Sequence, residues 1–129
     1  MKQFISHRGN LSGPDKNCEN NPVHIALLTD LNYQVEIDLW VGNNELFLGH
    51  DEPQYKITED FLKYENFWVH CKNLEALNWC QQSLSLPNYF WHENDKYCLT
   101  SHKYIWTYPG NPEPKFGAIV DLDKDWKTK

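Results

Sequence analysis

The sequence has no CxxC pair, no internal repeat, no low-complexity tract and no apolar stretch near the ~20 residues that a membrane-spanning helix needs. Basic residues are few, since 12 Lys and Arg stand against 18 Asp and Glu, and the net charge is −6. These absences argue against a membrane-spanning protein, a solenoid and a general nucleic-acid binder, because phosphate backbones are held mainly by clustered Lys and Arg. An anionic substrate would therefore need a local cation.

The four cysteines are spaced too irregularly to form a recognisable metal or redox motif, at Cys18, Cys71, Cys80 and Cys98. A strand-like segment begins within a few residues of Met1, which leaves no room for a signal peptide. We therefore expect free thiols and a cytoplasmic protein. With 129 residues, 40% of them apolar, we expect one core and one domain over 1–129.

Hydrophobic periodicity predicts an alternation of strands and helices. Asn21 and Asn73 each precede a run with helical spacing and are expected to cap helices, the first with Pro22 at its first position. The strand-like runs cover residues 4–7, 35–41, 45–50, 67–72, 89–92, 96–100, 104–108 and 118–122, and the helical runs cover 22–31, 58–63 and 74–82. This order predicts parallel βαβ units in the first hundred residues.

Two carboxylates lie two residues apart in the run 35–41. The period of two places Glu36, Asp38 and Trp40 on one face and the aliphatic residues on the other, with the two acids about 6.5–7 Å apart along the strand. On a core face two unpaired carboxylates would be costly, and a divalent cation would remove that cost. The alternative is a solvated strand face, and metal binding is the favoured interpretation.

Two histidines follow strand-like runs near these acids. His7 ends the first run and His50 follows the hairpin after the second, so they can approach one site from different directions, as one base and one acid would in an in-line displacement. The planar guanidinium group of Arg8 can donate two hydrogen bonds to phosphoryl oxygens, or it can form a salt bridge with Glu36 or Asp38. The two interactions are compatible.

Four segments give the chain a resemblance to a known family. They are His7–Asn10, Glu19–Pro22, Glu36–Asp38 and Gly49–Asp51, and two later segments, 69–72 and 104–110, extend the likeness over nearly the whole chain. In this order they resemble the glycerophosphodiester phosphodiesterase family of the phospholipase C-like phosphodiesterase superfamily. The chain resembles a short or truncated member.

The resemblance implies a fold as well as an activity. The family folds as a TIM-type (β/α) barrel with its site at the carboxyl ends of the strands, and 129 residues are too few for eight βα units. We therefore expect an α/β fold, an abbreviated or incomplete TIM-type barrel with mostly parallel strands and a shortened C-terminal part. Its open edge predicts either a homodimer or an open sheet closed by residues 89–108.

The resemblance also implies roles for individual residues. It makes His7 and His50 the general acid/base pair, and Arg8 and Lys72 phosphate contacts. It makes Glu36 and Asp38 metal ligands, with His70 in the third position and Glu19 as a supporting group near the metal or His7. Trp106 is expected to be either a core aromatic or a surface that stacks on substrate. Asn21 stands where the family has threonine, which is a mild departure.

His70 is the main departure from the family. Relatives usually carry an acidic residue two before the lysine of the third strand, which would complete a three-carboxylate site for Mg²⁺ or Ca²⁺. An imidazole is a poorer ligand for those ions and a better one for Mn²⁺ or Zn²⁺. The sequence therefore predicts a divalent metal but leaves its identity open.

These residues are compatible with two candidate functions. The first is a metal-dependent phosphodiester hydrolase acting on glycerophosphodiesters or related small alkyl phosphodiesters by His/His acid-base catalysis, with either water or a substrate hydroxyl as the attacking group. The second is a non-catalytic phosphate-binding or assembly protein derived from a truncated barrel. The short length and His70 favour the second, and the complete set of two histidines, arginine and two acids favours the first.

Overall fold

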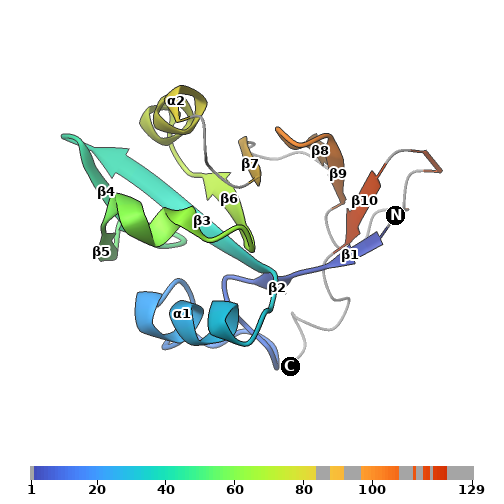
Figure 1. Ribbon diagram of the computed structural model, residues 1–129, viewed down its shortest axis with the longest axis horizontal. Coiled ribbons are helices and arrows are strands. Elements are labelled where there is room, and N and C mark those ends of the chain that lie inside the picture. Colours follow the sequence, from blue (N-terminus) through green and yellow to red (C-terminus); the bar gives the residue numbers. More distant parts are fainter. Residues whose placement is uncertain are drawn as a thin grey trace.

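The computed structural model describes residues 2–83, 88–91, 97–107, 112, 115–116 and 118–121. In these parts the chain forms two β-sheets, two α-helices and one 3₁₀ helix (Figure 1). The smaller sheet has the strand order β1-β10-β9-β8, and its strands are β1 (Lys2–Phe4), β10 (Ala118–Asp121), β9 (Tyr104–Thr107) and β8 (Tyr97–Leu99).

The larger sheet has six strands in the order β5-β4-β3-β6-β7, with β2 also paired to β3. Its strands are β2 (Ser6–His7), β3 (Val35–Gly42), β4 (Glu45–Leu48), β5 (Tyr55–Ile57), β6 (Phe67–Cys71) and β7 (Asn88–Trp91). The helices are α1 (Pro22–Asp30) between β2 and β3, η1 (Glu59–Lys63) before β6, and α2 (Leu74–Gln82) between β6 and β7.

The predicted incomplete TIM-type barrel with mostly parallel strands is wrong. β2, β3, β6 and β7 are parallel neighbours, but β3 pairs antiparallel with β4, and β4 antiparallel with β5. The cause is a two-residue hairpin at Asn43 and Asn44, both with positive φ, since this turn returns the chain at once where a barrel needs a crossover helix. The described strands form two separate sheets of mixed orientation, and no barrel closes among them.

The predicted helix caps are confirmed. The Asn21 side chain accepts a hydrogen bond from the Val23 N–H at 3.1 Å, and the Asn73 side chain accepts one from the Ala76 N–H at 2.9 Å. Each bond satisfies an N–H group that has no partner within its own helix. Among the described residues, neither helix combines the length and the apolar character that a membrane crossing requires.

Both faces of β3 and β6 are covered. The aliphatic face packs against the two helices in the main core, which includes Ile37 and Val69. The opposite face of the larger sheet carries Trp68 and Phe90, which pack against Trp106 of the smaller sheet in a second cluster. The predicted alternation along β3 is thus present, but its polar face is enclosed, and Glu36 and Asp38 lie inside the protein.

Truncation of Ile37 should destabilise the fold strongly. Its side chain is 0% exposed in the main core, so Ile37→Ala should lower the free energy of unfolding by about 2–5 kcal/mol through lost burial and a residual cavity. Urea denaturation measures the change. Val23→Ala on the outer face of α1, where Val23 is 74% exposed, is the control and should change stability by less than about 0.5 kcal/mol. Equal effects would contradict the described packing.

The four described cysteines are free thiols, as predicted, and they should differ in reactivity. Cys71 and Cys80 are fully buried with their sulfurs 3.7 Å apart, and this contact together with burial raises the pKa of the Cys71 thiol. Cys18 and Cys98 are half-buried. A chromogenic thiol reagent at pH 8 should therefore titrate two thiols in the folded protein and four in denaturant. Four equally fast thiols in the folded protein would contradict this assignment.

Candidate metal centre and its histidines

Two strands end next to each other on one edge of β3. β2 and β4 share one edge of β3, with β2 beside its first half and β4 beside its second half, and β6 lies along the other edge. β2 runs parallel to β3 and ends at His7, which is paired with Glu36. β4 runs antiparallel, and just after it the Gly49 N–H donates to the carbonyl oxygen of Asp38 at 3.2 Å. The chains that carry His7 and His50 therefore leave the sheet at the same place.

Three side chains at this place form a group that can hold a metal ion. Glu36 and Asp38 come from β3 and His70 comes from β6, where it is paired in register with Asp38. One ligand atom from each lies within 4.8 Å of the others. All three are buried, with exposed fractions of 1%, 1% and 9% respectively. Backbone pairing of two central strands thus fixes the spacing of the three donors.

The two acids have opposite electrostatic environments. Burial and the neighbouring charge of Asp38 raise the pKa of Glu36 well above its ordinary value. Burial alone would also raise the pKa of Asp38. The hydrogen bond from His70 and the positive charges near Asp38 outweigh burial, so the pKa of Asp38 is lowered. The Nδ1 atom of His70 lies 3.0 Å from Asp38 Oδ1 and 3.7 Å from Glu36 Oε2. The nearby positive charges thus outweigh burial at Asp38 but not at Glu36.

Arg8 lies beside the two acids, with Glu19 as its outer partner. It has a positive φ of 57°, and its backbone N–H donates to Glu36 Oε1 at 3.1 Å. Its guanidinium Nε lies 3.5 Å from Asp38 Oδ2, and its terminal nitrogen lies 3.7 Å from Glu19 Oε1. Glu19 also accepts a hydrogen bond from Asn10 at 3.1 Å. The predicted salt bridge between Arg8 and Asp38 is present.

Asn20 is a site residue that the sequence analysis missed. Its side-chain amide donates to Asp38 Oδ2 at 2.9 Å, and its side-chain oxygen accepts from the Asp38 backbone N–H, also at 2.9 Å. It is buried and has a φ of 56°, a conformation that asparagine tolerates better than most residues. The signal in the sequence was its place directly after Glu19 in the family-like segment. Asn20 fixes the orientation of the Asp38 carboxylate.

His7 is held in its neutral form. Burial and the neighbouring Arg8 charge lower the pKa of the His7 imidazole to about 3. Its Nε2 atom lies 3.9 Å from Glu36 Oε1. His7 is therefore an uncharged imidazole at neutral pH, and in this environment it is a weak base.

His50 approaches from the β4 side and is more open, at 38% exposed. Its Nδ1 atom lies 2.9 Å from Asp51 Oδ1. Burial and the charge of Arg8 lower the pKa of His50, while Asp38 and Asp51 oppose this change. The tight turn before it requires Gly49, because a Cβ there would collide with the carbonyl oxygen of Glu52. Asp51 is placed to stabilise a protonated His50.

Lys72 and Trp106 differ in their relation to the triad. Lys72 follows β6, and its charge acts on both Asp38 and His50. Trp106 is buried in the second cluster, where it stacks on Phe90 at 4.7 Å between ring centroids. Phe90 in turn stacks on the His70 ring at 5.0 Å and 10°. The structure thus places Trp106 in the core, one ring beyond His70, and not at a surface.

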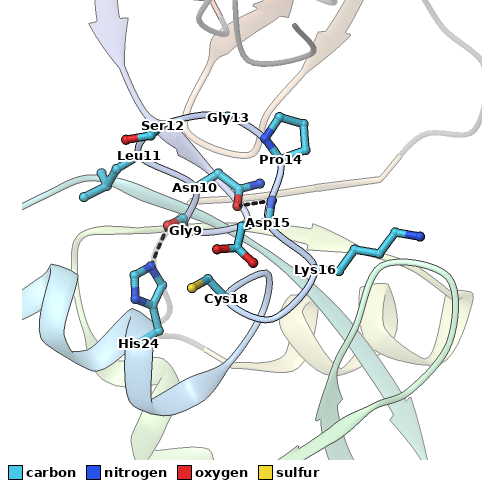
Figure 2. Close-up of a pocket in the computed structure, with 10 residues that line it drawn as sticks. All are labelled: Gly9, Asn10, Leu11, Ser12, Gly13, Pro14, Asp15, Lys16, Cys18 and His24. Atoms are coloured by element: carbon cyan, nitrogen blue, oxygen red, sulfur yellow. Dashed lines mark hydrogen bonds between the residues drawn. The ribbon is translucent and has the colours of Figure 1, made fainter. Parts of the chain in front are cut away.

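The loop between β2 and α1 is held by its own polar contacts (Figure 2). The His24 ring, which projects from α1, lies with its Nε2 atom 2.9 Å from the carbonyl oxygen of Gly9, and the Asn10 side chain accepts a hydrogen bond from the Asp15 N–H at 3.1 Å. Since Arg8 and Glu19 lie at the two ends of this loop, these contacts help to keep both side chains near Asp38.

Two cavities lie near the loop. The larger, about 490 Å³, is lined by loop residues together with Cys18 and His24 and contains none of the predicted site residues (Figure 2). The smaller, about 190 Å³, is lined by Glu19, Asn20 and His50 together with Lys16, Asp51, Glu52 and Gln54. The smaller cavity is therefore the one that adjoins the candidate metal centre.

The donor set fits a divalent cation. Two buried carboxylates and an imidazole within 4.8 Å of one another suit ion–ligand distances of about 2.0–2.6 Å. Two carboxylates buried side by side repel each other, and a divalent cation between them would offset that repulsion. Glu36, Asp38 and His70 would hold the ion. Glu19, expected as a supporting group near the metal or His7, is not part of this group among the described residues and pairs with Arg8.

The sequence matches no known protein-family model, and no curated protein or solved structure is significantly similar to the chain. The chemistry of the site therefore has to be argued from its own residues.

Replacement of Asn20 should disturb Asp38 and, through it, metal binding. Asn20→Gly keeps the positive φ but removes two hydrogen bonds to a buried acid, and it should lower the free energy of unfolding by about 1–3 kcal/mol. Asn20→Ala should cost about 1–2 kcal/mol more because of its strained backbone. Denaturation with and without metal measures both effects. Asn44→Gly, at an exposed turn with a φ of 61°, is the matched control and should be nearly neutral.

Glu36 should make the metal-free protein less stable as the pH rises. The pKa of Glu36 is higher in the folded protein than its ordinary value of about 4.5 in the unfolded chain. As the pH rises above this ordinary value, the unfolded chain releases the proton more readily than the folded protein does, and the folded state loses stability. Glu36→Gln removes this cost, and its stability advantage over wild type should grow between pH 5 and pH 8 in the presence of a chelator. Denaturation at several pH values measures the difference. A difference independent of pH would contradict the buried, uncompensated position of Glu36.

Proposed function

We propose that this chain is a metal-dependent phosphodiester hydrolase acting on small phosphodiesters such as glycerophosphodiesters. The observation that carries the proposal is the meeting of β2 and β4 on one edge of β3, which brings His7 and His50 to the buried group of Glu36, Asp38 and His70. A structural cluster of acids would not need two histidines beside it.

The proton chemistry follows from the different surroundings of the two histidines. His7 takes the proton from the attacking hydroxyl group, and for this step the negative charge of the bound phosphodiester has to raise the low pKa of His7. His50, supported by Asp51 at 2.9 Å, gives a proton to the leaving alkoxide oxygen as the P–O bond breaks. Exchange of protons with solvent through the more exposed His50 restores both groups. The attacking hydroxyl belongs either to the substrate or to water.

The charges around the phosphoryl group come from the chain and from the ion. When bound, the ion would neutralise a phosphoryl oxygen and make phosphorus easier to attack. Arg8 and Lys72 add two permanent positive charges near Asp38, and Arg8 has the planar fork that suits two phosphoryl oxygens. These cations supply the local attraction that a chain with a net charge of −6 needs for an anionic substrate.

The cavity beside His50 supports a small substrate. Its volume is about 190 Å³, and its lining includes Glu19 and Asn20 from the site loop. Space of this size accepts a small alcohol group on the leaving side of a phosphodiester and excludes a large one. The resemblance of segments 7–10, 36–38 and 49–51 to the glycerophosphodiester phosphodiesterase family supports the same substrate class.

The rival function is a non-catalytic phosphate-binding protein. The observation that favours it is His70 in the position where the family carries an acid, because an imidazole changes the charge of the metal site. Binding of phosphate without turnover under every metal tested would favour it over hydrolysis. The homodimer and the cytoplasmic location stay predictions.

Loss of either histidine should remove turnover but keep the metal. His7→Ala and His50→Ala should each lower kcat by about 10²–10⁴-fold on a chromogenic phosphodiester, because each removes one proton transfer. Metal affinity, measured by calorimetry, should change by less than about threefold, since neither residue belongs to the metal group. His102→Ala replaces an exposed histidine and is the control. Unchanged rates in both site variants would reject the assigned roles.

A further inference from the structure

His70 determines which ion the site can hold. It is one of three donors in the buried group, and it supplies the only nitrogen ligand there. Its Nδ1 atom already faces both acids, at 3.0 Å from Asp38 Oδ1 and 3.7 Å from Glu36 Oε2. A cation that replaced the proton between these groups would meet an imidazole nitrogen without any change in the position of the strands.

The imidazole has little freedom to turn away. His70 is paired in register with Asp38 across β3 and β6, its ring is stacked on Phe90 at 5.0 Å and 10°, and it is 9% exposed. Phe90 is itself held by stacking on Trp106 at 4.7 Å. Two strands and two aromatic rings therefore fix the nitrogen ligand, so an ion that rejects nitrogen cannot simply displace it with water.

The other acid near the site is committed elsewhere. Glu19 Oε1 accepts a hydrogen bond from Asn10 at 3.1 Å and lies 3.7 Å from the Arg8 guanidinium. A third carboxylate is therefore not at hand to complete an oxygen-only site. The donor set among the described residues remains two carboxylates and one imidazole.

Divalent ions differ in how tightly they bind a set of two carboxylates and one imidazole. Ca²⁺ takes six to eight oxygen ligands and Mg²⁺ takes an octahedron of oxygens, whereas Zn²⁺ binds readily to three protein ligands of mixed nitrogen and oxygen type and leaves one position open. Affinity for mixed sites also rises from Mn²⁺ toward Zn²⁺.

We propose that the Glu36–Asp38–His70 site is a transition-metal site that binds Zn²⁺ most tightly and Mn²⁺ next, and that it binds Mg²⁺ and Ca²⁺ weakly, with His70 as the residue that sets this order. The proposal rests on the metal centre of the proposed function but not on catalysis.

Calorimetric titration of the metal-free protein with each of the four ions tests the order. Zn²⁺ should bind with one ion per chain at an affinity at least 100-fold above that of Mg²⁺. Asp38→Asn should abolish this single site, which separates it from binding of Zn²⁺ to other histidines or thiols. Mg²⁺ or Ca²⁺ binding as tight as Zn²⁺ in the wild-type protein, or Zn²⁺ binding unchanged in Asp38→Asn, would overturn the proposal.

His70→Glu tests the assigned cause. It supplies an oxygen donor, so Mg²⁺ affinity should rise at least tenfold and Zn²⁺ affinity should fall at least tenfold. His102→Glu adds the same charge at an exposed position and should leave both affinities unchanged. An unaltered order in a folded His70→Glu variant would overturn the role of His70. If that variant does not fold, the wild-type titration and Asp38→Asn still decide the ion order.

Failure of this inference is distinguishable from failure of the proposed function. Hydrolysis of the chromogenic phosphodiester is measured separately with each ion. The predicted ion order without turnover supports the metal assignment and rejects the hydrolase. Turnover with Mg²⁺ or Ca²⁺, together with equal or weaker Zn²⁺ binding, supports the hydrolase and overturns the ion assignment.

Discussion

The burial of two carboxylates on the central strand is the constraint on which the rest of the site depends. Glu36 and Asp38 are each only 1% exposed, and an uncompensated charge in such a place is costly. The surrounding groups act on that cost in different ways. Asn20 and the Arg8 backbone N–H supply hydrogen bonds, while the Arg8 guanidinium and His70 supply ionic partners. Burial and the charge of Asp38 still raise the pKa of Glu36, so further positive charge near it would stabilise its ionised form.

Local patterns in the sequence predicted the local structure well. The period of two along β3 placed Glu36 and Asp38 on one face, and the asparagine caps of α1 and α2 were correct, because each depends only on neighbouring residues. The barrel was wrong because one short turn at Asn43 and Asn44 reverses the chain, and the periodicity of a strand does not reveal the direction of its partner. A family resemblance in the site segments therefore did not extend to the topology around them.

The role of Asn20 could not be predicted from the sequence, for a different reason. Its importance comes from a left-handed backbone conformation and from a contact with Asp38 that lies 18 positions away. The position of Trp106 likewise depends on the smaller sheet, which covers the polar face of β3 and β6. Trp106 lies in the core and stacks on Phe90, which in turn stacks on His70, so its contact with the site is indirect.

The smaller sheet joins two segments that lie far apart in the sequence, since β1 pairs in parallel with β10, with Lys2 opposite Ile119 and Phe4 opposite Asp121 (Figure 1). Strand pairs this distant in sequence form slowly, because the loop between them must close first. During synthesis, which proceeds from the N-terminus, the strands β2 to β7 of the larger sheet are made long before β10, which pairs with β1 in the smaller sheet. The nascent chain therefore passes through a period in which the strands of the larger sheet can already pair while the smaller sheet still lacks one of its strands.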